Sequence, residues 1–190
     1  MNFFYPPQPM RIWPNAPLFG RLSSSPDWVG EIKYNDWRIQ IHHSEKFLIY
    51  NRHNTIINID HKTFLPYFKD IPKDSIFDGG LLNFRTSDIK NVIVIWDAMF
   101  FGGKDLRKMP LQQRRKYLED FKEIPDTSKL KSLKNSQVFR NKQYKTKLKE
   151  LYNRIVERDD PMEEGIVLKD LKGGFEYSLK GSFDTSKWIK

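Results

Sequence analysis

The sequence contains no cysteine, and this absence rules out several kinds of site at once. Disulfides, thiolate zinc sites and a cysteine nucleophile are all excluded, a composition that fits a reducing compartment. Long hydrophobic runs are also missing. The longest apolar stretch, NVIVIWDAMFF (91–101), contains an aspartate and is shorter than the roughly 20 residues that span a bilayer. The N-terminus has prolines where a signal peptide needs a continuous apolar helix. We therefore expect a soluble, cytoplasmic or otherwise intracellular protein with no membrane partner.

Acidic residues are too few to balance the basic ones. The chain has 33 Lys and Arg against 24 Asp and Glu, a net charge of +9, which favours a polyanionic partner such as nucleic acid. The basic residues are densest in residues 129–149, which contain eight of them and no acid. This segment is either a solvated surface or a nucleic-acid contact. On the second interpretation, the candidate contacts are Lys131, Lys134, Lys145 and Lys147.

The remaining composition and patterning predict one domain that mixes helices and strands. A chain of 190 residues that is 38% hydrophobic can bury a core. Residues 1–28 are rich in Pro and Ser and predict an extended arm over a domain formed by residues 29–190. Strand patterns occur at 38–42, 46–50, 55–59, 75–84, 91–96 and 163–171, and helix patterns at 65–68 and 110–121. A further helix is indicated by the spacing of Tyr144, Leu148, Leu151, Tyr152 and Ile155.

Six groups of short motifs follow one another along the chain. They are EIKYNDWR (31–38), YNR (50–52), FDGGLL (77–82), VIWD with GGKDLRKMPLQQRRKYLE (94–119), EEGIVLK (163–169) and KWIK (187–190). From about residue 25 to the end, this series resembles the covalent nucleotidyltransferases: ATP-dependent DNA ligases, RNA ligases and mRNA-capping guanylyltransferases. Residues 96–119 are most similar to DNA ligases, whose pattern there is an aromatic-Asp pair, Gly-x-Asp-Leu, Pro-Leu, two arginines and Leu-Glu.

The resemblance implies a fold and a function. The fold would be α+β: a nucleotidyltransferase (ATP-grasp-like) domain of packed, mainly antiparallel sheets flanked by helices, with no OB-fold domain in this chain. The function would be that of a monomeric ATP-dependent DNA ligase, which forms a lysyl-AMP intermediate and seals nicks during DNA replication, repair and recombination. ATP and Mg²⁺ or Mn²⁺ would be the cofactors. Nicked duplex DNA would be the partner, with RNA as the alternative, and a viral or phage source is compatible.

The chemistry requires an amine that attacks the α-phosphorus of a nucleotide. A free lysine has a pKa near ~10.4 and is protonated at neutral pH, so burial and nearby cations would have to activate it. By resemblance Lys33 is this nucleophile. The resemblance assigns the other roles by motif position: adenine reading to Glu31 and the backbone of Ile32, base stacking to Trp96, ribose and phosphate or nick-end contacts to Arg38 and Arg52, metal and ribose contacts to Glu164, and α-phosphate binding to Lys169 and Lys190.

Three residues depart from the family pattern. Asn35 and Asp36 stand where the first motif has Asp-Gly, and Gly80 stands where Asp-Gly-Glu-Leu has Glu. An aspartate in place of glycine is expected to strain a left-handed backbone position or to crowd the pocket. Gly80 removes a carboxylate that would hold a ribose hydroxyl or a metal-bound water. The alternatives are therefore an RNA ligase, a capping guanylyltransferase, or a degenerate, non-catalytic domain that still binds nucleotide or nucleic acid.

Overall fold

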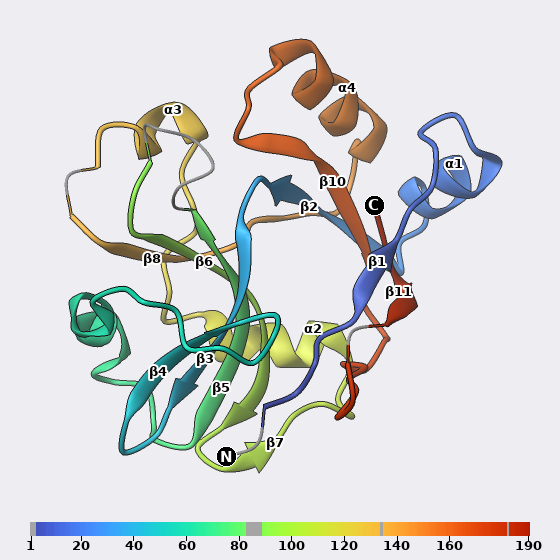
Figure 1. The fold of residues 1–190 in the computed structure, drawn as a ribbon. Coiled ribbons are helices and arrows are strands. Elements are labelled where there is room, and N and C mark those ends of the chain that lie inside the picture. The colour runs from blue at the N-terminus through green and yellow to red at the C-terminus, as the bar shows by residue number, and fades with distance from the viewer. Residues whose placement is uncertain (1–2, 83–88, 134, 182) are drawn as a thin grey trace.

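Two β-sheets face each other and are joined where one strand of the first continues into the second (Figure 1). This computed structural model describes residues 3–82, 89–133, 135–181 and 183–190. The large sheet has the order β4-β3-β5-β6-β7, with β8 paired in parallel to β6 and all other pairs antiparallel. Its strands are β3 (Trp37–His43), β4 (Phe47–Asn51), β5 (Ser75–Leu82), β6 (Val92–Phe101), β7 (Lys104–Asp105) and β8 (Gln137–Arg140).

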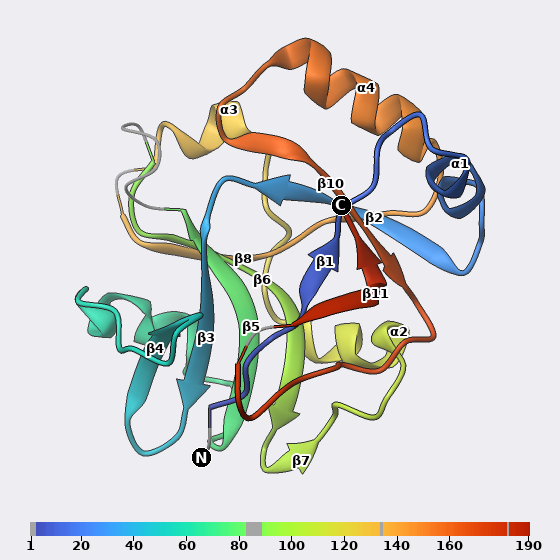
Figure 2. The same cartoon turned by 45° about the vertical axis from the view of Figure 1, so that its right-hand side comes forward.

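The small sheet has the order β1-β11-β10-β2-β9 and contains the first and last strands of the described chain. Only β1 and β11 run parallel to each other; the other pairs are antiparallel. Its strands are β1 (Gln8–Met10), β2 (Trp28–Tyr34), β9 (Gln143–Tyr144), β10 (Glu163–Asp170) and β11 (Asp184–Ile189). Figure 2 shows β1 and β11 side by side. The predicted architecture of mainly antiparallel sheets is confirmed.

Helices cover the outer faces of both sheets. They are α1 (Pro17–Ser23), η1 (His61–Phe68), α2 (Leu111–Arg114), η2 (Arg115–Leu118), α3 (Thr127–Leu130) and α4 (Leu148–Arg158). The aromatic side chains of η1 pack into the core of the large sheet, where Phe64 and Phe68 are fully buried. Helices α1 and α4 cover the small sheet (Figure 2), and Leu148, Leu151 and Ile155 form the buried face of α4.

The central strands β5 and β6 leave no room for a side chain at Gly79. Every residue of β5 is buried, which explains its continuous apolar pattern around a Gly-Gly pair. A Cβ on Gly79 would lie 2.6 Å from the carbonyl oxygen of Val94 on β6, so only glycine allows the two backbones to come this near. The longest apolar stretch of the sequence is β6, whose first eight residues are buried between its neighbours.

Two predicted helices and one predicted strand differ in extent from the structure. Tyr144 belongs to β9, and α4 begins only at Leu148, because Lys147 adopts a left-handed φ of 56° that turns the chain first. The helix predicted at 110–121 is a short α-helix continued by a 3-10 turn, which ends at Leu118. The strand predicted at 55–59 is reduced to a single bridge between Tyr50 and Ile56.

The N-terminal segment makes hydrogen bonds with both sheets. Beyond pairing with β11 through β1, it exchanges hydrogen bonds with β3: the backbone N–H of Phe4 donates to Gln40 Oε1 at 3.3 Å, and Gln40 Nε2 donates to the carbonyl of Phe4. The division into an arm of residues 1–28 and a domain of residues 29–190 stays a prediction. Among the described residues, no helix is both long and apolar enough to cross a membrane.

Candidate nucleotide-binding and catalytic site

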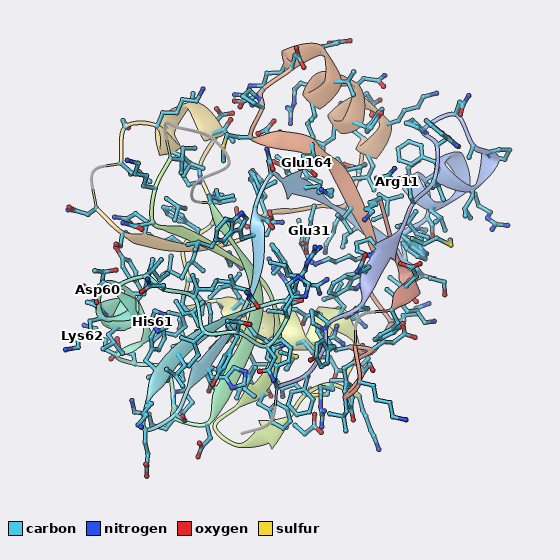
Figure 3. All side chains as sticks on the ribbon, viewed as in Figure 1. Arg11, Glu31, Asp60, His61, Lys62 and Glu164 are labelled. Carbon is cyan, nitrogen blue, oxygen red and sulfur yellow. The ribbon has the colours of Figure 1, made fainter. Side chains whose placement is uncertain are left out.

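Lys33 lies near the end of β2, where the small sheet faces the large one. Its partner across the ladder is Gly165 of β10. The neighbouring Glu164 forms an ion pair with the Lys33 ammonium, and the two side chains are 30% and 36% exposed. Figure 3 shows Glu164 in the upper part of the molecule, on β10. The lysine is thus half-buried and accessible, and its ion-pair partner is a carboxylate, which stabilises the charged ammonium.

A β-bulge between Glu163 and Gly165 interrupts the regular alternation of β10, and Glu164 at this bulge is the glutamate that reaches Lys33. Glu163 is 8% exposed and lies 3.5 Å from an Arg158 guanidinium nitrogen on α4. Burial raises the pKa of Glu163 above its ordinary value, and Arg158 partly opposes this. Glu164 instead lines two cavities together with Lys33, and its role toward metal and ribose stays a prediction.

Three cavities meet at Lys33. The outer cavity, of about 430 Å³, is also lined by Asp36, Arg52, Glu164 and Lys190. The inner cavity, of about 120 Å³, is lined by the buried residues Glu31, Trp96, Lys169 and Trp188, and it shares Asp36 and Arg38 with the outer cavity. A third cavity, of about 360 Å³, lies between β10 and the N-terminal segment around Trp13. An inner apolar space with a few polar groups, opening onto a charged outer space, suits a base linked to phosphates.

Glu31 is held by polar groups from several parts of the chain. It is 1% exposed and forms an ion pair with Lys169, whose Nζ lies 2.8 Å from its Oε2. Gln143 Nε2 donates to Glu31 Oε1 at 2.8 Å. Asn141 Nδ2 donates to Glu31 Oε2 at 3.3 Å and to the carbonyl of Ile32 at 3.2 Å, so it fixes the side chain and the adjoining backbone together. Glu31 and Ile32 therefore form one rigid polar edge of the inner cavity.

A second ionic cluster forms the large-sheet side of the inner cavity. Arg38 on β3 binds the fully buried Asp78 on β5 through two hydrogen bonds, Nε to Oδ1 at 3.1 Å and Nη2 to Oδ2 at 2.6 Å. The indole N–H of Trp96 donates to the same carboxylate at 2.8 Å. The Arg38 guanidinium also lies 5.1 Å from the ring centre of Trp188. These bonds fix the Trp96 ring as a flat cavity wall and restrict Arg38 to one orientation.

The remaining predicted nucleotide contacts lie at the outer cavity. Arg52 is exposed in the turn after β4, and its Nε donates to His53 at 3.1 Å. Lys190 follows β11, and its backbone is fixed by hydrogen bonds with Met10 and Ile12. The structure thus brings together Lys33, Glu31, Ile32, Arg38, Trp96 and Lys169 around the inner cavity, and Lys33, Arg38, Arg52, Glu164 and Lys190 around the outer one.

The predicted nucleic-acid lysines lie apart from these cavities. Lys131, Lys145 and Lys147 are exposed at the end of α3 and in the connection from β9 to α4, and none lines a cavity at Lys33. Lys134 lies outside the described residues.

The candidate site also uses residues that motif reasoning left unassigned. Asn141 and Gln143 orient Glu31, and Arg115 lies 3.9 Å from it while donating to the carbonyls of Trp96 and Asn141. Trp188 covers Lys169, with Nζ 4.4 Å from the ring centre. Asn141 carries no local sequence signal, because its role depends on contacts more than 100 positions away in the chain. Trp188 lies within the KWIK motif, from which Lys190 but not Trp188 was predicted to belong to the site.

Comparison with known proteins identifies the family. The fold is that of a nucleotidyltransferase domain: the ligase domain of Mycobacterium tuberculosis LigD matches 98% of this chain with a TM-score of 0.68 at 14% identity, over 58% of its own length. The ATP-dependent DNA ligase of bacteriophage T7, solved in complex with ATP, matches 98% of the chain with a TM-score of 0.61 at 15% identity, over 68% of its length. The chain belongs to the ATP-dependent DNA ligase domain family, whose sequence pattern matches residues 81–190.

Curated relatives agree with this assignment. DNA ligase 3 of Dictyostelium discoideum is 27% identical over 90% of this chain, and the DNA ligase of vaccinia virus (strain Western Reserve) is 27% identical over 84%. The chain spans only 16% and 31% of the lengths of these two relatives. The predicted family and fold are confirmed by these matches.

Proposed function

We propose that the chain is the adenylation domain of an ATP-dependent DNA ligase, with Lys33 as the nucleophile. The main support for this assignment is the position of Lys33, which lines both the inner cavity beside Trp96 and the charged outer cavity. A nucleotide whose base lies in the inner cavity, beside Trp96 and the Glu31–Ile32 edge, would present its α-phosphate to Lys33 Nζ. The ATP complex of the T7 ligase, which has the same fold, supports ATP as the nucleotide.

The proposed reaction proceeds in three transfers. The Lys33 ammonium first loses a proton to solvent, and the neutral amine then attacks the α-phosphorus of ATP. A P–N bond forms, the bond to the bridging oxygen breaks and pyrophosphate leaves with its electron pair, while the nitrogen loses its second proton to solvent. The AMP then passes from Lys33 to the 5′-phosphate at a DNA nick. Attack by the adjacent 3′-hydroxyl on that phosphate joins the strands and releases AMP. Lys169 and Lys190 offset the negative charge of the phosphates.

We propose Mg²⁺ or Mn²⁺ as the metal cofactor. The described residues contain no group of three His, Cys, Asp or Glu side chains able to hold a metal by themselves. Mg²⁺ commonly takes only one or two protein carboxylates and completes its coordination with substrate phosphates and water. Glu164, which lines the outer cavity, fits this requirement. When bound with the nucleotide, the metal supplies charge neutralisation at the phosphates.

The test is the intact mass of the protein after incubation with ATP and Mg²⁺. We expect one added AMP, labile to acid and to hydroxylamine, and no adduct in Lys33→Ala. Lys172→Ala is the matched control, because Lys172 is an exposed lysine paired with Asp27 outside the cavities. An adduct that persists in Lys33→Ala would refute Lys33 as the nucleophile. Exclusive labelling by GTP would favour a capping-type guanylyltransferase, and binding of ATP without any adduct would favour a non-catalytic domain.

A further inference from the structure

Asp36 and Gly80, the two most unusual departures from the family pattern, are in direct contact. A Cβ built on Gly80 would lie 2.5 Å from Asp36 Cγ, 2.6 Å from Oδ2 and 2.9 Å from Cβ. Real Cβ atoms do not approach other atoms this closely, so no side chain at position 80 can coexist with Asp36 in its present place. The Asp36 side chain therefore occupies the volume that a side chain of residue 80 would fill.

Strand register explains why these two positions compete. Gly80 on β5 is paired with Arg38 on β3, and Asp36 is two positions before Arg38. Paired residues share one face of a sheet, so Arg38 and the Cβ direction of Gly80 point to the same side, and Asp36, in the turn just before β3, places its side chain over Gly80 on that side. This side is the one that lines the cavities, since Asp36 and Arg38 border both the inner and the outer cavity.

The backbone around Asp36 is not distorted by the replacement of glycine. The non-glycine residues with positive φ in the described part of the chain are Asn54, Asp74, Asn91, Lys147 and Asp159, and Asp36 is not among them. The expectation of a left-handed position at residue 36 is therefore wrong. Asn35 anchors the same turn, because its backbone N–H donates to Met162 and its side-chain amide donates to Pro161 at 3.2 Å. An aspartate at position 35 could not make the second bond, since a carboxylate has no N–H to donate.

We propose that Asp36 supplies the acidic group that Gly80 cannot carry, and that its carboxylate accepts hydrogen bonds from the ribose hydroxyls of the bound nucleotide. This inference rests on the proposed function of the same cavity. The sugar is assigned because it links base to phosphates, and Asp36 lies where the aromatic inner cavity meets the charged outer one. Asp36 and Gly80 therefore act together. The family pattern has its carboxylate on β5, whereas this chain has one in the turn between β2 and β3, and Gly80 leaves the space that Asp36 occupies.

The joint role of Asp36 and Gly80 can be tested with a double-mutant cycle. Asp36→Gly removes the carboxylate, and Gly80→Ala adds one methyl group that displaces it. We expect each to slow adenylation and weaken ATP binding by roughly tenfold to a hundredfold, the range for loss of hydrogen bonds to a charged group. The double variant should be no worse than either single variant, because both remove the same contact. Asp36→Gly combined with Gly80→Glu, which returns a carboxylate from the other strand, should recover part of the loss.

A binding measurement with deoxynucleotides and a matched control variant make the test specific to the ribose. Binding is measured by calorimetry in the Lys33→Ala background with ATP, 2′-deoxy-ATP and 3′-deoxy-ATP, so that it does not depend on adduct formation. We expect the preference for ATP over at least one deoxynucleotide to disappear in Asp36→Gly. Gly181→Ala is the matched control, because a Cβ there meets nothing within 4 Å. Thermal unfolding of every variant checks that the fold is kept.

Several results would overturn the inference. Faster or unchanged adenylation in Asp36→Gly would show that the carboxylate crowds the pocket or has no part in it. Additive losses in the double variant would show that the two positions are independent. An equal loss with ATP and both deoxynucleotides would remove the ribose from the assignment. Absence of the lysyl-AMP adduct in the unmodified chain would count against the proposed function alone, because the binding measurement still decides the role of Asp36.

Discussion

A buried pair of single residues, Arg114 and Asp97, stabilises the interior of the large sheet. Arg114 and Asp97 are both fully buried, and the guanidinium donates two hydrogen bonds of 2.8 Å to the carboxylate. Arg114 also donates to the carbonyl oxygens of Met109 and Gly173. The first arginine of the RRKYLE tract thus connects α2, β6 and the loop before β11. Its role in this structure is architectural, whereas the second arginine, Arg115, points toward Glu31 in the candidate site.

Loss of one partner from this pair should be severe, because it leaves the other charge buried and unpaired. We expect Arg114→Leu to lower the free energy of unfolding by roughly 3–5 kcal/mol, measured by urea denaturation. Adding Asp97→Asn should recover part of that loss, since it removes the unpaired charge. Lys172→Ala, at an exposed pair, should leave stability unchanged. Stability equal to the parent in Arg114→Leu would show that the pair contributes nothing.

Helix α4 shows how the ends of an element are determined. It lies between two residues in the left-handed region, Lys147 at φ 56° and Asp159 at φ 47°. At the second end, the backbone N–H of Asp159 donates to the carbonyl of Ile155 and closes the last turn. Glycine favours this position because it has no Cβ to strain.

Replacing Asp159 with glycine should therefore stabilise the protein. We expect Asp159→Gly to raise the free energy of unfolding by a few tenths to about 1 kcal/mol, because relief of left-handed strain outweighs the greater freedom of glycine in the unfolded chain. Asp159→Ala is the control, since it removes the same negative charge from the helix C-terminus but keeps the Cβ. Equal stability of the glycine and alanine variants would show that charge, not backbone conformation, governs this end.

The charge of the whole molecule bears on its proposed partner. Lys131, Lys145 and Lys147 are exposed and lie outside the cavities, so they can contact a phosphate backbone without taking part in adenylation. A surface that binds phosphates should show weak sequence preference and strong salt dependence. The proposed DNA partner can therefore be separated experimentally from the proposed chemistry.

Reversal of these three lysines to glutamate should weaken binding of nicked duplex DNA and leave adenylation unchanged. The slope of log affinity against log salt should fall by up to about 3, one for each lost phosphate contact. The control reverses Lys62, Lys69 and Lys73, which are exposed on and near η1, where Figure 3 shows Lys62 far from Glu164. Each triple variant takes the net charge from +9 to +3. Equal losses in both would indicate that net charge alone drives binding, and loss of adenylation would place the segment in the catalytic site.

The family, the position of the candidate nucleophile and the strands β3, β4, β5, β6 and β10 could be predicted from the sequence alone. These depend on short motifs and local periodicity: Lys33 lies on a strand next to a turn, and residues 163–169 form the strand beside it. The start of α4 was harder to predict from the sequence, because it depends on the left-handed conformation of Lys147, which lysine seldom adopts.

Which residues share a cavity wall could be learned only from the folded chain. Asn141 and Gln143 reach Glu31 from β9 and the residues just before it, and Asp36 fills the space above Gly80, 44 positions away. In the sequence, Asp36 and Gly80 are two separate departures that weaken the family pattern. The turn before β3 brings the Asp36 side chain into the space that a side chain at position 80 would fill, so that each replacement accounts for the other. The physical reason is that strand pairing brings together residues whose separation along the chain carries no information about their contact.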